Sequence, residues 1–96
     1  MTGIADLREK RAEILRIAAS HGVTSLRVFG SFARGDPGPD SDVDFLVDVG
    51  PKTSSWFPAG LILDLEPIIG RHVEVVTERG LYHRLREKVL REAVPL

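Results

Sequence analysis

The stretch GSFARGDPGPDSDVDFLV, residues 30–47, places a glycine, a serine and a Pro/Gly-rich turn directly before two aspartates. The segment DVDFLVDV predicts a strand over 42–49, because apolar residues alternate there with Asp42 and Asp44. Side chains two residues apart on a strand project from one face, roughly 6–7 Å from each other. Two carboxylates so placed repel, and a bound cation is the usual remedy. An isolated Asp-x-Asp pair also occurs at solvated strand ends, so its surroundings must decide between the two interpretations.

Two further strands are expected on either side of this segment. LRVFG, residues 26–30, predicts a strand that stops at Gly30, and HVEVVT, residues 72–77, predicts one in which Glu74 faces away from the apolar side. Apolar residues at helical spacing predict helices over 4–21, 61–69 and 81–94, and residues 31–34 can form one helical turn. In the connector before residues 61–69, Ser54 or Ser55 can cap the start of the helix. This order of elements indicates an α/β fold in which a small mixed three-stranded sheet is flanked by helices.

Length and composition limit the class of protein. The chain has 96 residues, 13 basic and 14 acidic side chains, a net charge of −1 and no cysteine. We expect a single domain over 1–96, without disulfides or thiolate chemistry. The charge balance lacks the basic surface that binds long nucleic acid. The N-terminal segment is unlike a secretory signal and no apolar run could span a bilayer, so we expect a cytoplasmic protein with no membrane association.

The residues before the aspartates suit a phosphate. A glycine at the end of a strand lets an anion approach the backbone, and Ser31 offers both its amide and its hydroxyl. Gly30 and Ser31 also suit a plain turn. Arg34 can neutralise a triphosphate or pair with Asp36, and the sequence leaves both roles open. Carboxylate oxygens such as those of Asp42 and Asp44 suit Mg²⁺ or Mn²⁺, so the stretch predicts a site for a metal and a phosphorylated substrate.

This combination resembles the nucleotidyltransferases of the DNA polymerase beta superfamily. Their signature is a hydrophobic residue, Gly, Gly or Ser, about ten residues, then Asp-hydrophobic-Asp-hydrophobic, with a third acidic residue on a later strand. Phe29-Gly30-Ser31, ten residues, Asp42-Val43-Asp44-Phe45 and the later Glu74 match it. Nearly the whole chain looks like the minimal nucleotidyltransferases of that superfamily, which implies the same fold. The resemblance implies that Asp42, Asp44 and Glu74 hold Mg²⁺ or Mn²⁺, and that Gly30 and Ser31 bind the phosphates.

The resemblance also implies an activity and a partner. Proteins of this type are antitoxins of HEPN-domain ribonuclease toxins, and they transfer AMP from ATP onto the toxin, typically onto a tyrosine. Two rival interpretations remain open at this stage: an antitoxin that neutralises its toxin by binding alone, and a nucleotidyltransferase that modifies a small molecule. Acceptor, base preference and oligomeric state, whether monomer or homo-oligomer, do not follow from the sequence.

The chain departs from the family pattern at two positions. Phe32 stands where the family usually has an arginine, which removes a contact to the triphosphate while Arg34 remains. Glu74 stands where the third acid is usually aspartate. Outside the motif, we expect Trp56 in the core or at a helix start, rather than stacked on adenine, and we expect Leu85 on the buried stripe of the last helix.

Overall fold

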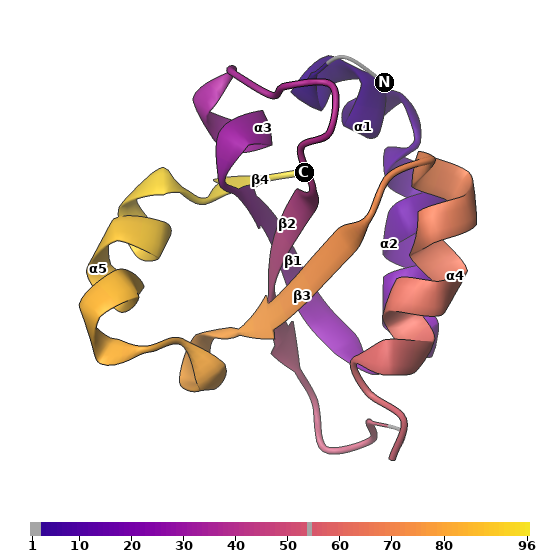
Figure 1. Ribbon diagram of the computed structural model, residues 1–96. Helices are drawn as coiled ribbons and strands as arrows, with labels where there is room; N and C mark the ends of the chain where they lie inside the picture. Colours follow the sequence, from indigo (N-terminus) through magenta and orange to yellow (C-terminus); the bar gives the residue numbers. More distant parts are fainter. Residues whose placement is uncertain (1–2, 54) are drawn as a thin grey trace.

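The computed structural model describes residues 3–53 and 55–96 (Figure 1). A mixed four-stranded sheet has the strand order β3-β2-β1-β4, with β2 parallel to β3 and β1 antiparallel to both of its neighbours. The elements are α1 (Ile4–Glu9), α2 (Arg11–Ser20), β1 (Val23–Phe29), α3 (Ser31–Arg34), β2 (Val43–Val49), α4 (Ala59–Ile69), β3 (Val73–Thr77), the 3₁₀ turn η1 (Glu78–Gly80), α5 (His83–Glu92) and β4 (Val94–Pro95). The predicted class, a mixed sheet flanked by helices, is confirmed.

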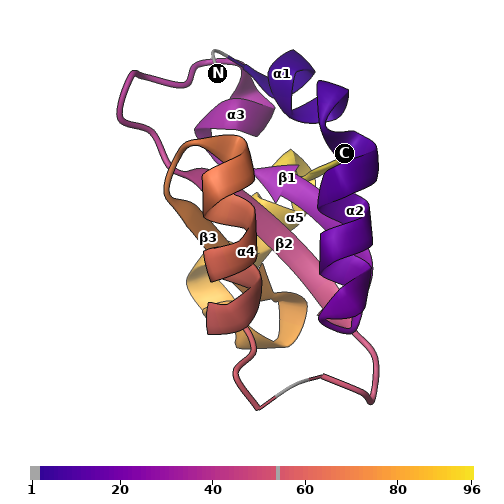
Figure 2. The same ribbon diagram turned by 90° about the vertical axis from the view of Figure 1, so that its right-hand side faces the viewer.

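Helices cover the sheet unequally. Figures 1 and 2 show α2 and α4 side by side on one face, whereas α5 lies beyond the opposite face. Val43, Phe45 and Val47 of β2 are buried in the main apolar cluster together with residues of α2 and α4. Because side chains alternate along a strand, Asp44 points to the other face, where α5 leaves room for a cleft.

Two expectations about the chain ends are wrong. The sheet has a fourth strand because Val94–Pro95 pairs with β1, and a two-residue strand is too short to show any alternation. The expected single helix over 4–21 is divided into α1 and α2 at Lys10, whose φ of −101° and ψ of 12° are not helical. Lys10 Nζ donates to the Ile68 carbonyl 2.6 Å away, so a contact with α4 accompanies the break.

Trp56 is 76% exposed, so it does not lie in the core; it lies at the start of α4, the other place expected for it, where its carbonyl accepts the Gly60 N–H at 2.9 Å. The expectation for Leu85 is wrong. Leu85 is 51% exposed because α5 lies away from the sheet. Among the described residues of α5, Val89 is the one that is buried. The N-cap of α4 is Pro58, and no side chain caps the helix; Ser54 lies outside the described residues. Within residues 3–53 and 55–96, no helix has the length and apolar character that crossing a membrane requires.

Candidate active site

A cleft of about 390 Å³ opens on the face of the sheet that carries Asp44. It contains every site residue expected from the sequence: Gly30, Ser31, Arg34, Asp42, Asp44 and Glu74. The end of β1, the start of β2 and β3 form its floor, and Leu85, Lys88, Val89 and Glu92 of α5 form one wall. Segments that are far apart in the sequence therefore meet at one surface.

The carboxylates come together through the register of the sheet. Asp44 and Glu74 are direct neighbours across the parallel pair β2 and β3, and their side chains are hydrogen bonded. Asp42 lies one residue before β2, exposed at the rim of the same cleft, rather than within the strand as expected. Partial burial, the hydrogen bond with Glu74 and the negative charges of Glu74 and Asp42 raise the pKa of Asp44 to about 7.

A divalent cation would neutralise the negative charges of Glu74 and Asp42, which contribute to this raised pKa after burial and the hydrogen bond. The donor set consists of carboxylate oxygens, the ligands that Mg²⁺ and Mn²⁺ prefer, so its chemistry fits such an ion. Within the described part of the chain, however, no three acidic, histidine or cysteine side chains are already gathered as a complete ligand set. The cleft thus carries oxygen donors that suit a divalent cation. Asp44 and Glu74 are in contact, whereas Asp42 lies apart from them.

Gly30 is required at its position for two reasons. Its φ of 75° lies in the left-handed region that favours glycine, and a β-carbon at this residue would collide with the Asp44 carboxylate. The close approach lets the turn into α3 lie directly beside the acidic pair. Ser31, half-buried, opens α3 and lines the cleft. The backbone of this turn and the carboxylates therefore face the same space.

Phe32 points away from the cleft. It is fully buried in the core, and the guanidinium of Arg71 lies over its ring, 5.1 Å from the centroid. Arg71 Nη1 also donates to the carbonyls of Gly38 and Ser41, each 2.9 Å away. Phe32 and Arg71 thus join α3 to the loop that leads into Asp42, and the departure from the family pattern serves packing.

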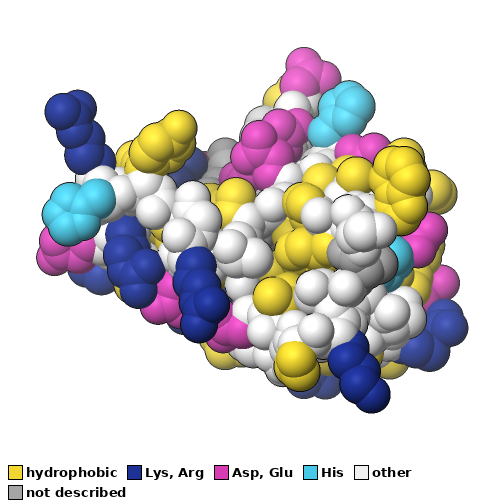
Figure 3. Space-filling view, turned by 90° about the horizontal axis from the view of Figure 1, so that it is seen from below, with side chains coloured by type: hydrophobic (Ala, Val, Ile, Leu, Met, Phe, Trp, Pro, Cys, Tyr) yellow, Lys and Arg dark blue, Asp and Glu magenta, His cyan; other side chains and the backbone are white. Residues whose placement is uncertain are grey.

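Arg34 has two acidic partners. Its Nε lies 3.5 Å from Asp36 Oδ1, the pair that the sequence left open, and its Nη1 donates to Glu92 Oε1 at 2.6 Å. Glu92 was not identified from the sequence, and neither was Lys88, a second cation in the cleft. Both belong to a helix whose charged residues look like a solvated surface. On the left of Figure 3, Lys and Arg side chains gather over α5.

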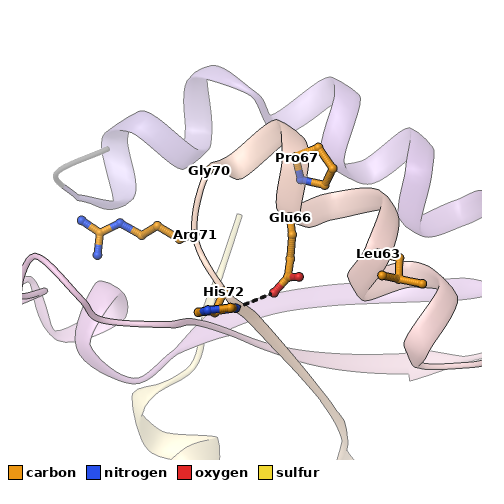
Figure 4. Close-up of a pocket in the computed structure, with 6 residues that line it drawn as sticks. All are labelled: Leu63, Glu66, Pro67, Gly70, Arg71 and His72. Carbon is orange, nitrogen blue, oxygen red and sulfur yellow. Dashed lines mark hydrogen bonds and ion pairs between the residues drawn. The ribbon is translucent and has the colours of Figure 1, made fainter.

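A second hollow, of about 480 Å³, lies at the far end of α4 (Figure 4). Glu66 and His72 face each other there, 3.3 Å apart, while Arg71 points away from them. Glu66 also accepts the Val73 backbone N–H at 2.9 Å, and this bond is the main reason why the pKa of Glu66 is lowered. These contacts attach the end of α4 to the start of β3, a structural role.

Known proteins resemble the chain over most of its length. The model of the nucleotidyltransferase domain family matches residues 8–96. A Methanocaldococcus jannaschii protein, provisionally named a protein adenylyltransferase, is 34% identical over 89 residues, which are 93% of this chain and 96% of the relative. The protein adenylyltransferase MntA of Thermococcus cleftensis is 40% identical over 73 residues, 76% of this chain and 74% of that protein.

Solved structures agree with this assignment. One that is provisionally described as a minimal nucleotidyltransferase is 47% identical, with a TM-score of 0.84 and coverage of 98% of this chain and 96% of that one. A toxin–antitoxin crystal structure with AMP-PNP shares the fold at 19% identity and a TM-score of 0.74, over 88% of this chain and 69% of that one. The chain therefore belongs to the nucleotidyltransferase domain family, as one of its minimal members.

Proposed function

We propose that this nucleotidyltransferase is the antitoxin of a HEPN-type toxin in the cytoplasm, and that it transfers AMP from ATP to a tyrosine of that toxin with the aid of Mg²⁺ or Mn²⁺. The observation that carries the chemistry is the contact between Asp44 and Glu74 beside the Gly30–Ser31 turn. Two neighbouring carboxylates beside a backbone turn that lines the cleft suit a cation that also binds a phosphorylated substrate.

The polar side chains of the cleft that face the proposed substrate have separate roles. Ser31 binds the triphosphate through its hydroxyl and backbone amide, and Arg34 and Lys88 balance its negative charge. Asp42 and Asp44 would hold two divalent cations, and Glu74 would add a ligand to the one that activates the acceptor hydroxyl. A divalent cation bound to these carboxylates would lower the pKa of the acceptor hydroxyl and stabilise the charge on the leaving pyrophosphate.

The transfer itself is a single displacement at the α-phosphorus. The tyrosine oxygen forms a bond to phosphorus, the bond to the β-phosphate oxygen breaks, and the hydroxyl proton passes to solvent. Catalysis of this kind depends on positioning and electrostatic stabilisation more than on covalent participation by the protein. The rigid sheet supplies that positioning, because Phe29, Asp44 and Glu74 lie in one row across three strands.

The choice of a protein acceptor rests on the relatives and on the shape of the cleft. The relatives named protein adenylyltransferases support AMP transfer to a protein, and a protein of the same fold belongs to a toxin–antitoxin assembly crystallised with AMP-PNP. The cleft is open to solvent rather than enclosed. A folded partner would bring its own binding surface and present the hydroxyl.

The decisive experiment is intact-mass spectrometry of the partner. The cognate HEPN-type toxin, incubated with the protein, ATP and Mg²⁺, should gain mass in steps of one AMP and stay inactive after the two proteins are separated. Asp42→Asn with Asp44→Asn should abolish the gain while the variant stays folded. Full neutralisation by this double variant without any mass gain would show an antitoxin that acts by binding, and modification of a small molecule alone would also contradict the proposal.

A further inference from the structure

Glu92, the last residue of α5, forms two hydrogen bonds with the phosphate-binding side of the cleft. Its Oε2 accepts the Gly30 backbone N–H at 3.0 Å, and its Oε1 accepts from Arg34 Nη1 at 2.6 Å. Only 13% of the Glu92 side chain is exposed. The Glu92 carboxylate therefore binds both the Gly30 N–H and the Arg34 guanidinium, which lie on either side of Ser31 in the sequence.

The location of Glu92 is unfavourable for the helix that carries it. A negative charge in the last turn of a helix opposes the helix dipole. Partial burial also pushes the pKa of Glu92 upward, but the hydrogen bonds from Arg34 and Gly30 outweigh it, so that the pKa lies below its ordinary value. The stabilisation of this carboxylate thus comes from the two groups that it contacts across the cleft.

We propose that Glu92 is a positioning residue for the nucleotide: it turns Arg34 toward the triphosphate and fixes the Gly30 amide, so that Ser31 meets the phosphates without rearrangement. This role rests on the proposed function of the cleft. Gly30 is buried at a positive φ, and Glu92 supplies the acceptor for its N–H. Arg34 keeps its Nη2 for a phosphate, because Nε and Nη1 contact Asp36 and Glu92.

Two variants of Glu92 separate its two contacts. Glu92→Gln keeps an oxygen for the Gly30 amide but removes the charge that holds Arg34, whereas Glu92→Ala removes both. Glu87→Gln is the matched control, because Glu87 is an exposed glutamate on the same helix and outside the cleft. Thermal unfolding of every variant establishes that it is folded, and Glu92→Gln still tests the role if Glu92→Ala is not.

Calorimetric titration with AMP-PNP and Mg²⁺ measures the effect on nucleotide binding. Glu92→Gln should weaken binding roughly three- to tenfold, as expected for loss of one charge-assisted contact at a partly exposed arginine. Glu92→Ala should weaken it further, and Glu87→Gln should match the wild type. In the Arg34→Gln background, Glu92→Gln should cost little more, because its effect passes through Arg34.

The outcomes are distinguishable. Equal or tighter binding by Glu92→Gln would overturn the role, since tighter binding would mean that the carboxylate competes with the phosphates. Additive losses in the double variant would also overturn it, because they would indicate a general structural effect. Absence of AMP-PNP binding by the wild type would instead contradict the proposed function itself.

Amide hydrogen exchange tests the Gly30 contact without nucleotide. The Gly30 amide should exchange at least about tenfold faster in Glu92→Ala than in the wild type, and near the wild-type rate in Glu92→Gln. Equal exchange in all three proteins would show that Glu92 does not hold the turn.

Discussion

At the scale of single residues, Asp44 has the most constrained environment in the cleft. The Gly30 backbone approaches it so closely that no side chain fits between them, and Glu74 lies beside it on the next strand. Burial on one side and negative charge on the other favour its protonated form while no cation is bound. The contact between Asp44 and Glu74 thus has two effects: it suits the site to a cation, and it lowers the stability of the fold when Asp44 is ionised without one.

The first prediction concerns the pH dependence of stability. The pKa of Asp44 is raised from 3.8 to about 7 in the folded protein. Between these values the folded state binds more protons than the unfolded state, so the free energy of unfolding falls as pH rises from about 4 to 7. Asp44→Asn should remove this loss, which is of the order of 1–2 kcal/mol after allowing for solvent screening.

Urea denaturation without divalent cations, at pH 4.5 and pH 7.5, measures this difference. Asp48→Asn, on the same strand outside the cleft, is the control and should follow the wild type. A wild type that loses no more stability than Asp44→Asn over this range would show that Asp44 ionises freely.

The second prediction concerns Glu74. If Glu74 acts on the acceptor side, Glu74→Gln should lower kcat by at least about tenfold and change the affinity for ATP much less, since the interaction is made mainly in the transition state. Glu74→Asp restores the usual family residue and should keep most of the activity. Rates of AMP transfer, with ATP binding measured separately, provide the comparison; a fully active Glu74→Gln variant would leave Glu74 as a surface acid.

At the scale of elements, α3 and the loop over residues 36–41 are joined by Phe32 and Arg71. The ring is buried below the guanidinium, which donates to two carbonyls of the loop. A flat aromatic face suits this contact because it attracts a cation without needing a counter-charge. The loop that leads into Asp42 is thereby held by the two hydrogen bonds of Arg71, whose guanidinium rests on the Phe32 ring.

The third prediction tests this junction. Phe32→Arg, which restores the usual family residue, should lower the free energy of unfolding by about 3 kcal/mol or more, because it places a charged guanidinium in the apolar core, next to the cation of Arg71. Phe32→Met, similar in volume and apolar, should cost roughly 1 kcal/mol. Chemical denaturation measures both, and an equally stable Phe32→Arg protein would mean that the side chain can leave the core.

At the scale of the whole molecule, α3, which lines the cleft, and the turn over residues 55–58 that leads into α4 lie far apart. Figure 1 shows this turn at the bottom, whereas α3 lies at the top. Trp56, in this turn, is exposed and does not line the cleft. Tyr82 and Leu85, also exposed, lie at the start of α5, and Leu85 lines the cleft. A nucleotide bound in the cleft would therefore not contact Trp56.

The fourth prediction follows from that separation. Saturation with AMP-PNP and Mg²⁺ should leave the intensity and wavelength of Trp56 fluorescence nearly unchanged, because stacking on adenine requires contact. Trp56→Phe should bind AMP-PNP within about twofold of the wild type, as is usual for exposed residues remote from a site. Strong quenching on nucleotide binding would show that the turn reaches the adenine.

The sequence alone determined the features that depend on local chemistry. The alternation over 42–49 located β2 and the face of Asp44, and the glycine before Ser31 indicated a turn that an anion can approach. The spacing of these residues, with Glu74 on a later strand, was sufficient for the family and for a mixed sheet flanked by helices. The alternation and the turn are visible because each depends on residues that are near one another in the chain, whereas Glu74 was assigned through the resemblance to the family.

Only the tertiary structure decided the features that depend on distant partners. Glu92 meets Gly30 across 62 residues of sequence and Arg34 across 58, so nothing local distinguishes it from the other acids of α5. The same holds for β4, which exists only because β1 offers it an edge, and for Leu85, which is exposed because α5 stands away from the sheet. Periodicity shows which side of an element is apolar, whereas packing of the whole chain decides what covers that side.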